Sequence, residues 1–469
     1  MSKYAPGPRG YPVLGVLPKL RQEPLQVLLD ATHRFGDVVY LGRDLHRVYL
    51  VNHPDFIEHV LDIHHPTYGK GSAVERIKPL FGEGLTTSNG EAWRHQRRLL
   101  RPVFHARRIT GLAAVITQAT TELLTDWQAL SERGQPLAIA TEMMNLTRAI
   151  IVRALFGNDV DGEIPALSEA LTIALEYTNR RVWGVIDIPK YFPTPRNRHF
   201  RTALHLLDRL VYRTIDRRSQ KGEDKSDLIS VLMDLHDEET DEPMSTQQLR
   251  DQIMTLFIAG HTTAAAALAW LWIVLAQHPR IEQRLQNEVR TVLGDRLPTA
   301  EDIRILSYPR RVINEVMRLY PPTWVTARTP LEDDQIGGYW IPARSVVLLS
   351  PYLMHRHACF WKHPEAFDPA RFSPEQSAQR PRYAYFPFGG GPRTCIGRGL
   401  ALMELQLIVM MVTRRYRLEL LPGQQLTPKP ALTLAPPQGT LMRLYKQDDL
   451  AKASTPSEQL AHNQPIAHF

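Results

Sequence analysis

The sequence predicts a mainly helical α+β protein, and three observations lead to this fold class. Apolar residues recur three and four positions apart over much of 90–290, which is typical of amphipathic helices. Near the N-terminus, short apolar runs at 38–41 and 48–51 indicate a small β-hairpin. The 24 residues of 253–276 carry no formal charge and indicate a long helix. Polar residues in the middle of this stretch favour a helix inside a soluble core over a membrane span.

The other elements follow from local patterns along the chain. Prolines interrupt an apolar, aromatic segment at 182–195, which predicts a loop. A helix that begins near Pro309 must end before Pro321 and Pro322, because proline lacks an N–H and restricts the preceding residue. The remaining expected elements are helices at 25–35, 123–130, 143–155, 204–211, 228–235 and 397–415, a strand at 345–349 and a hairpin within 418–444.

The composition excludes several classes of protein. The formal net charge is +7, but the basic residues are scattered among acids, so no nucleic-acid partner is expected. Two cysteines, Cys359 and Cys395, are too few for a disulfide framework or an iron–sulfur cluster, and they fit a reducing cytoplasm. No basic stretch followed by an apolar run precedes Tyr4, so neither a signal peptide nor an N-terminal anchor is expected.

Cys395 carries the central functional inference. The run 388–397 reads Phe-Gly-Gly-Gly-Pro-Arg-Thr-Cys-Ile-Gly, and its glycines would let the backbone approach a flat ligand. Arg393 adds positive charge near the sulfur, and Gly397 opens a helix whose amides would face a thiolate. The alternative is a glycine-rich loop around a buried, unreactive cysteine. A nucleotide-binding loop is disfavoured, because the glycine spacing is wrong and no lysine follows.

This run resembles, position for position, the heme-binding signature of the cytochrome P-450 superfamily, in its soluble bacterial type. The resemblance implies a single helix-rich domain at 1–447, with a proline- and glycine-rich arm at 1–20 and a buried heme b. The polar segment 448–469 is expected to be a disordered tail. By the resemblance, Cys395 is the axial ligand of the heme iron. The other cofactor-binding residues that the signature implies are Phe388, Gly389, Arg393 and Gly397.

A second pair of motifs resembles a structural cluster of the same family. The segment Glu315-Val316-Met317-Arg318 resembles the family's Glu-x-x-Arg helix, and Arg371 takes the place of the downstream arginine that completes a buried cluster. Two guanidinium groups that share one carboxylate are tolerable in a core only when their hydrogen bonds are satisfied. For Glu315 and Arg318 alone, a surface ion pair at helical spacing is the open alternative.

Three arginines match positions that bind the heme propionates in the family. Trp93 and Arg97 resemble the Trp-x-x-x-Arg helix, in which the arginine grips a propionate and the tryptophan supports it. Arg328 and Arg393 match two further propionate-binding arginines. Bidentate guanidinium contacts are strong where water is scarce, although each arginine taken alone reads as ordinary solvated charge.

The middle of the charge-free helix resembles the family's oxygen-binding stretch. The stretch begins at Ala259, and the resemblance implies that Gly260 loosens this helix and that the Thr263 hydroxyl helps to deliver protons beside the iron. The sequence departs from the family at Thr262, which stands where an acid is usual, so protons must come through Thr263, water or another residue. His261 has a suitable pKa, but it points about 100° away from Thr262 around a helix, which favours a packing role.

The resemblance implies a monooxygenase of secondary metabolism that inserts one atom of O2 into a hydrophobic fatty acid, terpene or polyketide-like substrate. A separate ferredoxin or flavodoxin-type donor with its reductase would supply electrons. Two alternatives stay open: an enzyme that uses or rearranges peroxides, because the acid is missing at Thr262, and a heme-binding sensor without turnover. Matching the family's regions places the substrate pocket at Val74, Ile77, Phe81, Ile258, Trp324, Val325 and Leu434.

Overall fold

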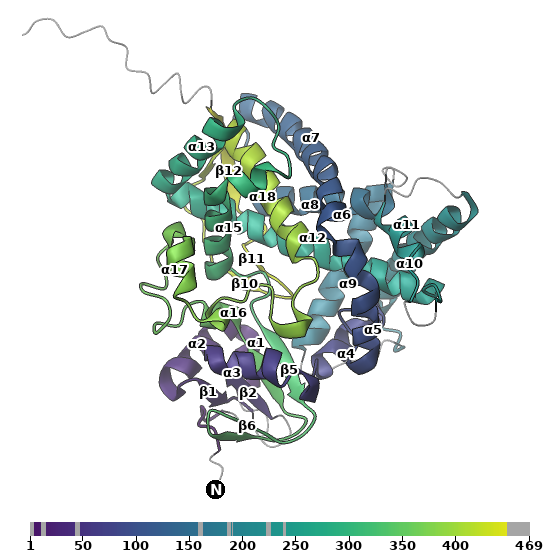
Figure 1. The fold of residues 1–469 in the computed structure, drawn as a ribbon, viewed down its shortest axis with the longest axis vertical. Helices are drawn as coiled ribbons and strands as arrows, with labels where there is room; N and C mark the ends of the chain where they lie inside the picture. The colour runs from purple at the N-terminus through teal and green to yellow at the C-terminus, as the bar shows by residue number, and fades with distance from the viewer. Residues whose placement is uncertain are drawn as a thin grey trace, which may run out of the picture.

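A computed structural model of the chain describes residues 4–10, 16–42, 47–157, 163–184, 189, 191–221, 227–237 and 241–447. The expected tail at 448–469 and part of the expected loop at 182–195 lie outside the described residues. Helices dominate the fold; β1, β2, β5 and β6 lie with α1, α2 and α3 at one end, whereas β12 lies near α13 and α18 at the other (Figure 1). A mainly helical α+β fold, as predicted, is confirmed.

The helical elements include short 3-10 turns and one π-helical turn, η1. Their bounds are α1 Leu17–Gln22, α2 Pro24–Phe35, α3 Pro54–Glu58, η1 His59–Ile63, η2 His65–Thr67, α4 Ser72–Phe81, α5 Gly90–Leu100, η3 Arg101–Phe104, α6 Ala106–Gly111, α7 Ala113–Glu132, α8 Ile139–Phe156, α9 Ile164–Trp183, α10 Pro195–Lys221, α11 Leu228–Met233, α12 Thr246–Gln277, α13 Pro279–Leu293, α14 Asp302–Ile305, α15 Ser307–Leu319, α16 Pro351–Met354, η5 Pro369–Phe372, α17 Pro374–Ala378, η6 Arg382–Ala384, η7 Gly391–Arg393 and α18 Arg398–Arg415.

The described strands form one five-stranded sheet and three smaller ones. In the large sheet the order is β1-β2-β8-β5-β3, with β2 and β8 parallel and the other pairs antiparallel. A three-stranded sheet runs β4-β12-β9, and β6–β7 and β10–β11 are two-stranded. The bounds are β1 Val38–Tyr40, β2 Val48–Val51, β3 Tyr68–Gly69, β4 Leu137–Ala138, β5 Thr326–Pro330, β6 Asp334–Ile336, β7 Tyr339–Ile341, β8 Val346–Leu349, β9 Tyr416–Leu420, β10 Lys429–Pro430, β11 Leu434–Ala435 and β12 Leu441–Lys446.

The charge-free stretch lies within α12, the longest helix, which crosses the middle of the molecule (Figure 1). Its apolar part is long enough to span a membrane, yet 83% of that window is buried inside the protein. The helix begins seven residues earlier than the charge-free stretch. Ser245 and Gln248 form a reciprocal capping box there, and the charged Arg250 and Asp251 are buried in the first turns. The absence of charged residues therefore predicted the central part of this helix but not the residue at which it begins.

Several predicted boundaries agree with the structure to within a few residues, but α7 and α10 extend well beyond the expected helices at 123–130 and 204–211. The hairpin β1–β2, the end of α15 at Leu319 and the pairing of β9 with β12 are confirmed. The predicted loop at 182–195 begins later than expected, because α9 continues to Trp183. The sequence analysis missed the β6–β7 hairpin, whose turn uses Gly337 and Gly338 at positive φ.

Candidate active site

The loop that carries Cys395 is closed by its own backbone. The Cys395 amide donates to the carbonyl of Phe388 at 2.9 Å, so the chain reverses between these residues. Gly389 has a φ of 71°, a conformation that L side chains rarely adopt, and a Cβ built there would meet nothing within 4 Å. Of the three glycines, Gly389 therefore fits the expectation of a backbone left open to a ligand.

The other two glycines pack against protein instead. A Cβ at Gly390 would lie 2.2 Å from the ring of Tyr383, and one at Gly391 would lie 1.9 Å from the carbonyl oxygen of Leu61. The Gly391 amide also donates to the Tyr383 hydroxyl at 3.0 Å. A side chain at either position would prevent the cysteine loop from packing against η1 and Tyr383. Glycine is therefore required at these two positions by packing within the protein.

The Cys395 thiol is accessible yet poorly solvated. Cys395 is exposed to solvent as a residue. Protein atoms nevertheless surround its sulfur closely, and this desolvation raises the pKa of the thiol. A hydrogen bond from the Gly397 amide and the charges of Arg97 and Arg398 lower that pKa without reversing the shift. The positive charge expected from Arg393 thus comes from other arginines. The protein alone favours the neutral thiol, and a bound metal cation would deprotonate it.

Helix α12 presents the predicted oxygen-binding stretch. Ala259 is exposed although buried residues flank it in the middle of a core helix, and Thr262 and Thr263 are half-buried. The Thr263 hydroxyl donates to the Ala259 carbonyl at 2.9 Å, and the Thr262 hydroxyl donates to the Ile258 carbonyl at 3.0 Å. Both threonines therefore bond within their own helix.

Gly260 has a packing position in this helix. A Cβ there would lie 2.9 Å from Cδ1 of Ile151, so the glycine lets α8 approach α12 closely. The helix is continuous through this point. His261 is buried, and its Nδ1 lies 2.6 Å from the Phe257 carbonyl, to which the ring donates. Burial lowers the pKa of His261 to about 4, so it is a neutral core residue.

Four cations from separate elements converge near the cysteine loop. Lys70 follows β3, Arg97 lies in α5, Arg328 in β5 and Arg393 in η7. Burial, with the charges of the three arginines, lowers the pKa of Lys70 to about 6, so this amine is mostly neutral at pH 7 until an anionic ligand binds. Burial and Arg393 lower the pKa of Arg328 to about 10. Within the part of the chain that the structure describes, none of the four forms an ion pair with a carboxylate.

Neutral groups hold these cations in place. Lys70 Nζ donates to two backbone carbonyls, those of Leu85 at 2.7 Å and Thr86 at 2.8 Å. Arg393 donates to Asn89 Oδ1 at 3.1 Å, and its guanidinium lies 4.6 Å from the ring centroid of Trp93. A cluster of this kind is stabilised by a ligand with more than one negative charge. The two propionates of the heme that the sequence implies have the required charge, so these residues fit that group.

Lys70 could not be predicted from the sequence, because a lysine after a two-residue strand has no local signature. Only the tertiary structure brings it beside Arg97, Arg328 and Arg393. Asn89 was missed for the same reason, although its Oδ1 also accepts from the Lys70 amide at 3.0 Å.

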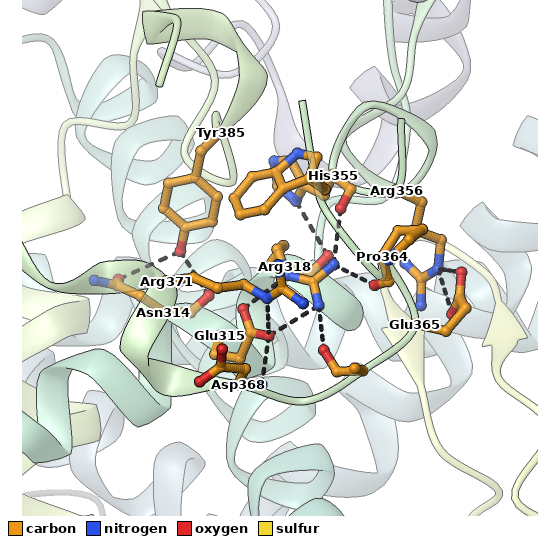
Figure 2. Close-up of polar contacts among 12 residues, drawn as sticks. Asn314, Glu315, Arg318, His355, Arg356, Pro364, Glu365, Asp368, Arg371 and Tyr385 are labelled. Atoms are coloured by element: carbon orange, nitrogen blue, oxygen red, sulfur yellow. Dashed lines mark hydrogen bonds and ion pairs between the residues drawn. The ribbon is translucent and has the colours of Figure 1, made fainter. Parts of the chain in front are cut away.

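The buried carboxylate of Glu315 is surrounded by donors (Figure 2). Arg318 contacts it twice, at 2.7 and 2.9 Å, and Arg371 Nε lies 3.3 Å from it. The Asp368 amide donates to it at 2.8 Å. Glu315 and Arg318 are both fully buried, so the open alternative of a surface ion pair does not describe them. The remaining Arg318 donors contact the carbonyls of His355, Pro364 and Ala366.

His355 joins this cluster to the cysteine loop. Its Nδ1 lies 3.2 Å from the Arg318 carbonyl, and its Nε2 lies 3.0 Å from the Phe386 amide. The ring therefore donates from Nδ1 and accepts at Nε2, which makes it neutral. Burial and the charge of Arg318 lower the pKa of His355 well below its usual value. Phe386 lies two residues before Phe388, where the cysteine loop closes.

The seven predicted pocket residues fall into separate regions. Ile77, Phe81 and Ile258 belong to one hydrophobic cluster, whereas Trp324, Val325 and Leu434 belong to another; Val74 is half-buried. The side chains of Trp324 and Leu434 are buried among protein atoms and are not exposed to a solvent-accessible pocket. Trp324 stacks on Trp183, with ring centroids 5.2 Å apart.

Neither of two cavities near the cysteine loop is lined by these apolar residues. One, of about 520 Å³, lies between Tyr68, Trp93, Thr329 and Arg393. The other, of about 270 Å³, is polar and contacts the cysteine loop. Both belong to the charged surroundings of the loop and not to the predicted substrate pocket.

Comparison with known proteins shows what the chain resembles. A family model described as Cytochrome P450 matches residues 5–443. The chain is 36% identical over 436 residues to cyclooctatin synthase of Streptomyces melanosporofaciens, which covers 92% of this chain and 94% of that protein. It is 34% identical over 420 residues to cyclooctat-9-en-7-ol 5-monooxygenase of the same organism, covering 89% and 90%. The crystal structure of the cytochrome P450DA heme domain has a TM-score of 0.87 at 26% identity, covering 95% and 98%.

Proposed function

Because the chain belongs to the cytochrome P450 family, a family of heme-thiolate monooxygenases, we propose that Cys395 binds the heme iron and that the substrate is an apolar, terpene-like molecule. The observation that carries the proposal is an accessible thiol near three arginines and Lys70, basic side chains that lack a carboxylate partner among the described residues. Arg97 connects the two features, because its charge acts on both Cys395 and Lys70.

Lys70, Arg97, Arg328 and Arg393 hold the propionates in this proposal, and Trp93 supports the two guanidiniums of Arg97 and Arg393 that lie near its ring. The heme supplies the oxygen-activating redox chemistry when it is bound. The Gly397 amide orients the sulfur of Cys395. Phe388 and Gly389 form the open side of the loop that would face the porphyrin.

Thr263 holds a proton at its hydroxyl beside the exposed Ala259. That proton is donated to the Ala259 carbonyl, and it can be redirected toward a water molecule without breaking the helix. Thr262 stands where the family has an acid and cannot resupply the proton, since a hydroxyl does not ionise at neutral pH. Bulk water entering beside Ala259 is therefore the proposed source of protons.

The substrate class follows from the side chains available to it. Ile77, Phe81 and Ile258, the predicted pocket residues that share one apolar cluster, would bind a substrate through area removed from water and not through an ion pair. One similar protein is named for its action on cyclooctat-9-en-7-ol, an unsaturated ring alcohol. A polycyclic terpene hydrocarbon or alcohol fits both observations.

A separate acidic electron donor is proposed to dock at the polar cavity next to the cysteine loop. Arg310, Arg380, Arg382 and Arg398 line this cavity, together with Phe388 of the loop. A basic concave surface raises the rate of encounter with an acidic partner, and this rate falls with salt. The donor is expected to be a ferredoxin or flavodoxin, and the enzyme is expected to work in the cytoplasm.

The absent acid at Thr262 favours one second candidate, a peroxide-using enzyme of the same family. Turnover of a terpene substrate with O2, ferredoxin and reductase, compared with turnover in hydrogen peroxide alone, separates the two. Faster turnover with the donor system supports the monooxygenase. Turnover with peroxide only supports the alternative.

The iron ligand is tested by the spectrum of the reduced protein with carbon monoxide. Wild-type protein is expected to show the absorption typical of thiolate ligation, and Cys395→Ser to lose it. Cys359→Ser is the matched control, since Cys359 is the other cysteine in the sequence and is also exposed. An unchanged spectrum in Cys395→Ser would overturn the proposal.

A further inference from the structure

Helix α10 carries an unpaired basic stripe on its outer face. Arg198, Arg201, His205 and Arg209 are three or four residues apart, so they lie on one side of the helix, and all four are exposed. None of them has an ion-pair partner among the residues that the structure describes. The helix lies at the outer edge of the helical part (Figure 1). Its opposite face is buried through Phe200, Ala203, Leu207, Leu210 and Thr214.

Two exposed aromatic side chains lie just before this helix. Tyr191 is 73% exposed and Phe192 is 49% exposed, with ring centroids 5.3 Å apart. The segment is anchored, because Asn197 donates from Nδ2 to the carbonyls of Pro189 at 3.0 Å and Phe192 at 2.8 Å. Asn197 in turn accepts from the Tyr177 hydroxyl at 2.9 Å. The segment that carries the aromatic pair is thus held in place by the buried Asn197 side chain.

We infer that Tyr191, Phe192 and the basic stripe of α10 form a docking surface for the anionic phospholipids of a membrane. Basic side chains are attracted to an anionic lipid surface, and aromatic rings favour the boundary between headgroups and acyl chains. The buried face of α10 remains on the protein core, so the enzyme would rest on the bilayer and not span it.

A lipid surface explains this combination better than a soluble polyanion does. A nucleic acid or an acidic protein accounts for the arginines, but a large exposed tyrosine and phenylalanine side by side cost solubility unless they are covered. Resting on a membrane removes both rings from water and places the cations at the phosphate level. The proposed apolar substrate would then be drawn from the same lipid, a point that rests on the proposed function.

Co-sedimentation of the heme-loaded protein with vesicles tests the inference directly. Vesicles of equal parts phosphatidylcholine and phosphatidylglycerol are expected to bind the protein, and pure phosphatidylcholine vesicles to bind it weakly. Added salt should weaken binding to the mixed vesicles, because screening shortens the range of the attraction. The stripe variant is expected to bind mixed vesicles about a hundredfold more weakly; it combines Arg198→Ser, Arg201→Ser and Arg209→Ser.

A matched control removes the same charge elsewhere on the surface. It combines Arg280→Ser, Arg304→Ser and Arg415→Ser, three exposed arginines on α13, α14 and α18. This control should bind mixed vesicles much as wild type does. The carbon monoxide spectrum of each variant verifies that it is folded. Equal weakening by the stripe variant and the control would show a net-charge effect and overturn the inference.

The aromatic pair provides an independent arm. Tyr191→Ser with Phe192→Ser keeps every charge, and it is expected to leave binding salt-sensitive but weaker by at least tenfold. If this variant binds as wild type does, the surface is purely electrostatic and the membrane assignment is wrong. Tighter, stripe-dependent binding to polyglutamate or duplex DNA than to mixed vesicles would likewise overturn it. Because only binding is measured, this result does not depend on catalysis.

Discussion

Single charged residues divide into two opposite kinds in this molecule. The Glu315 carboxylate lies beside two arginines, Arg318 and Arg371. Lys70 and the three arginines near it have no carboxylate partner among the described residues. In the first arrangement the charges are paired within the folded chain, whereas the second is stabilised when an anionic ligand binds. The motifs in the sequence predicted Glu315 and the arginines, but not Lys70, since its position depends on neighbours distant in the chain.

Replacing Glu315 with alanine is expected to destabilise the protein by about 3–5 kcal/mol and to abolish heme loading, because two guanidiniums would remain buried without a counter-charge. The free energy of unfolding in denaturant and the heme content measure this. Glu365→Ala is the control. Glu365 also pairs with an arginine, Arg356, but its side chain is 72% exposed, so its loss should cost less than about 1 kcal/mol.

Replacing Lys70 with glutamine is expected to speed heme loss about tenfold, because one of four cations around the propionates is removed. Transfer of heme to an excess of a heme-free acceptor protein measures the rate. Lys78→Gln is the control, since Lys78 pairs with Glu75 and Glu83 on the surface. An equal rate in both variants would show that Lys70 does not contact the cofactor.

At the scale of elements, α12 and α18 are packed closely against their neighbours in the core. Gly260 brings α8 against α12, and α18 continues from the cysteine loop into the core. Within α18 the Glu404 carboxyl is buried, and its Oε1 has no hydrogen-bond partner. Burial raises the pKa of Glu404 to about 8, so the folded protein holds it neutral.

Glu404 gives a pH dependence with a definite sign. The folded state keeps a proton that the unfolded state releases above about pH 4.5, so stability falls as pH rises from about 4.5 to about 8. Glu404→Gln mimics the neutral acid and should lose less stability between pH 6 and pH 8 than wild type. Melting temperatures across this range measure the difference. Glu419→Gln on β9 is the control, because Glu419 is exposed and should leave the slope unchanged.

At the scale of the whole molecule, the sequence predicted the helical fold, the central helix and the cysteine loop, because each has a local pattern. It could not predict which glycines of that loop contact protein, since Tyr383 and Leu61 reach them only in the folded chain. Trp324 and Leu434 were predicted as pocket walls; in the folded chain both side chains are buried, and Trp324 stacks on Trp183.

The whole chain is expected to be more stable with heme than without it, because the four cations come from separate elements that only the ligand neutralises. Protein produced without heme should melt several degrees lower, and added heme should restore the melting temperature. Heme dimethyl ester, whose propionates carry no charge, is the control and should restore much less. Equal recovery with the ester would show that the cations stabilise by some other means.

The neutral imidazole of His355 has a consequence for how the protein fails in acid. Once both ring nitrogens carry protons, the ring can no longer accept from the Phe386 amide, and a positive charge appears beside Arg318. The unfolded chain takes up this proton readily below about pH 6.5, while the native fold resists it. Protonation of His355 would therefore free the segment 386–395 that leads to Cys395. Loss of heme and of tertiary structure in acid would begin with this one imidazole.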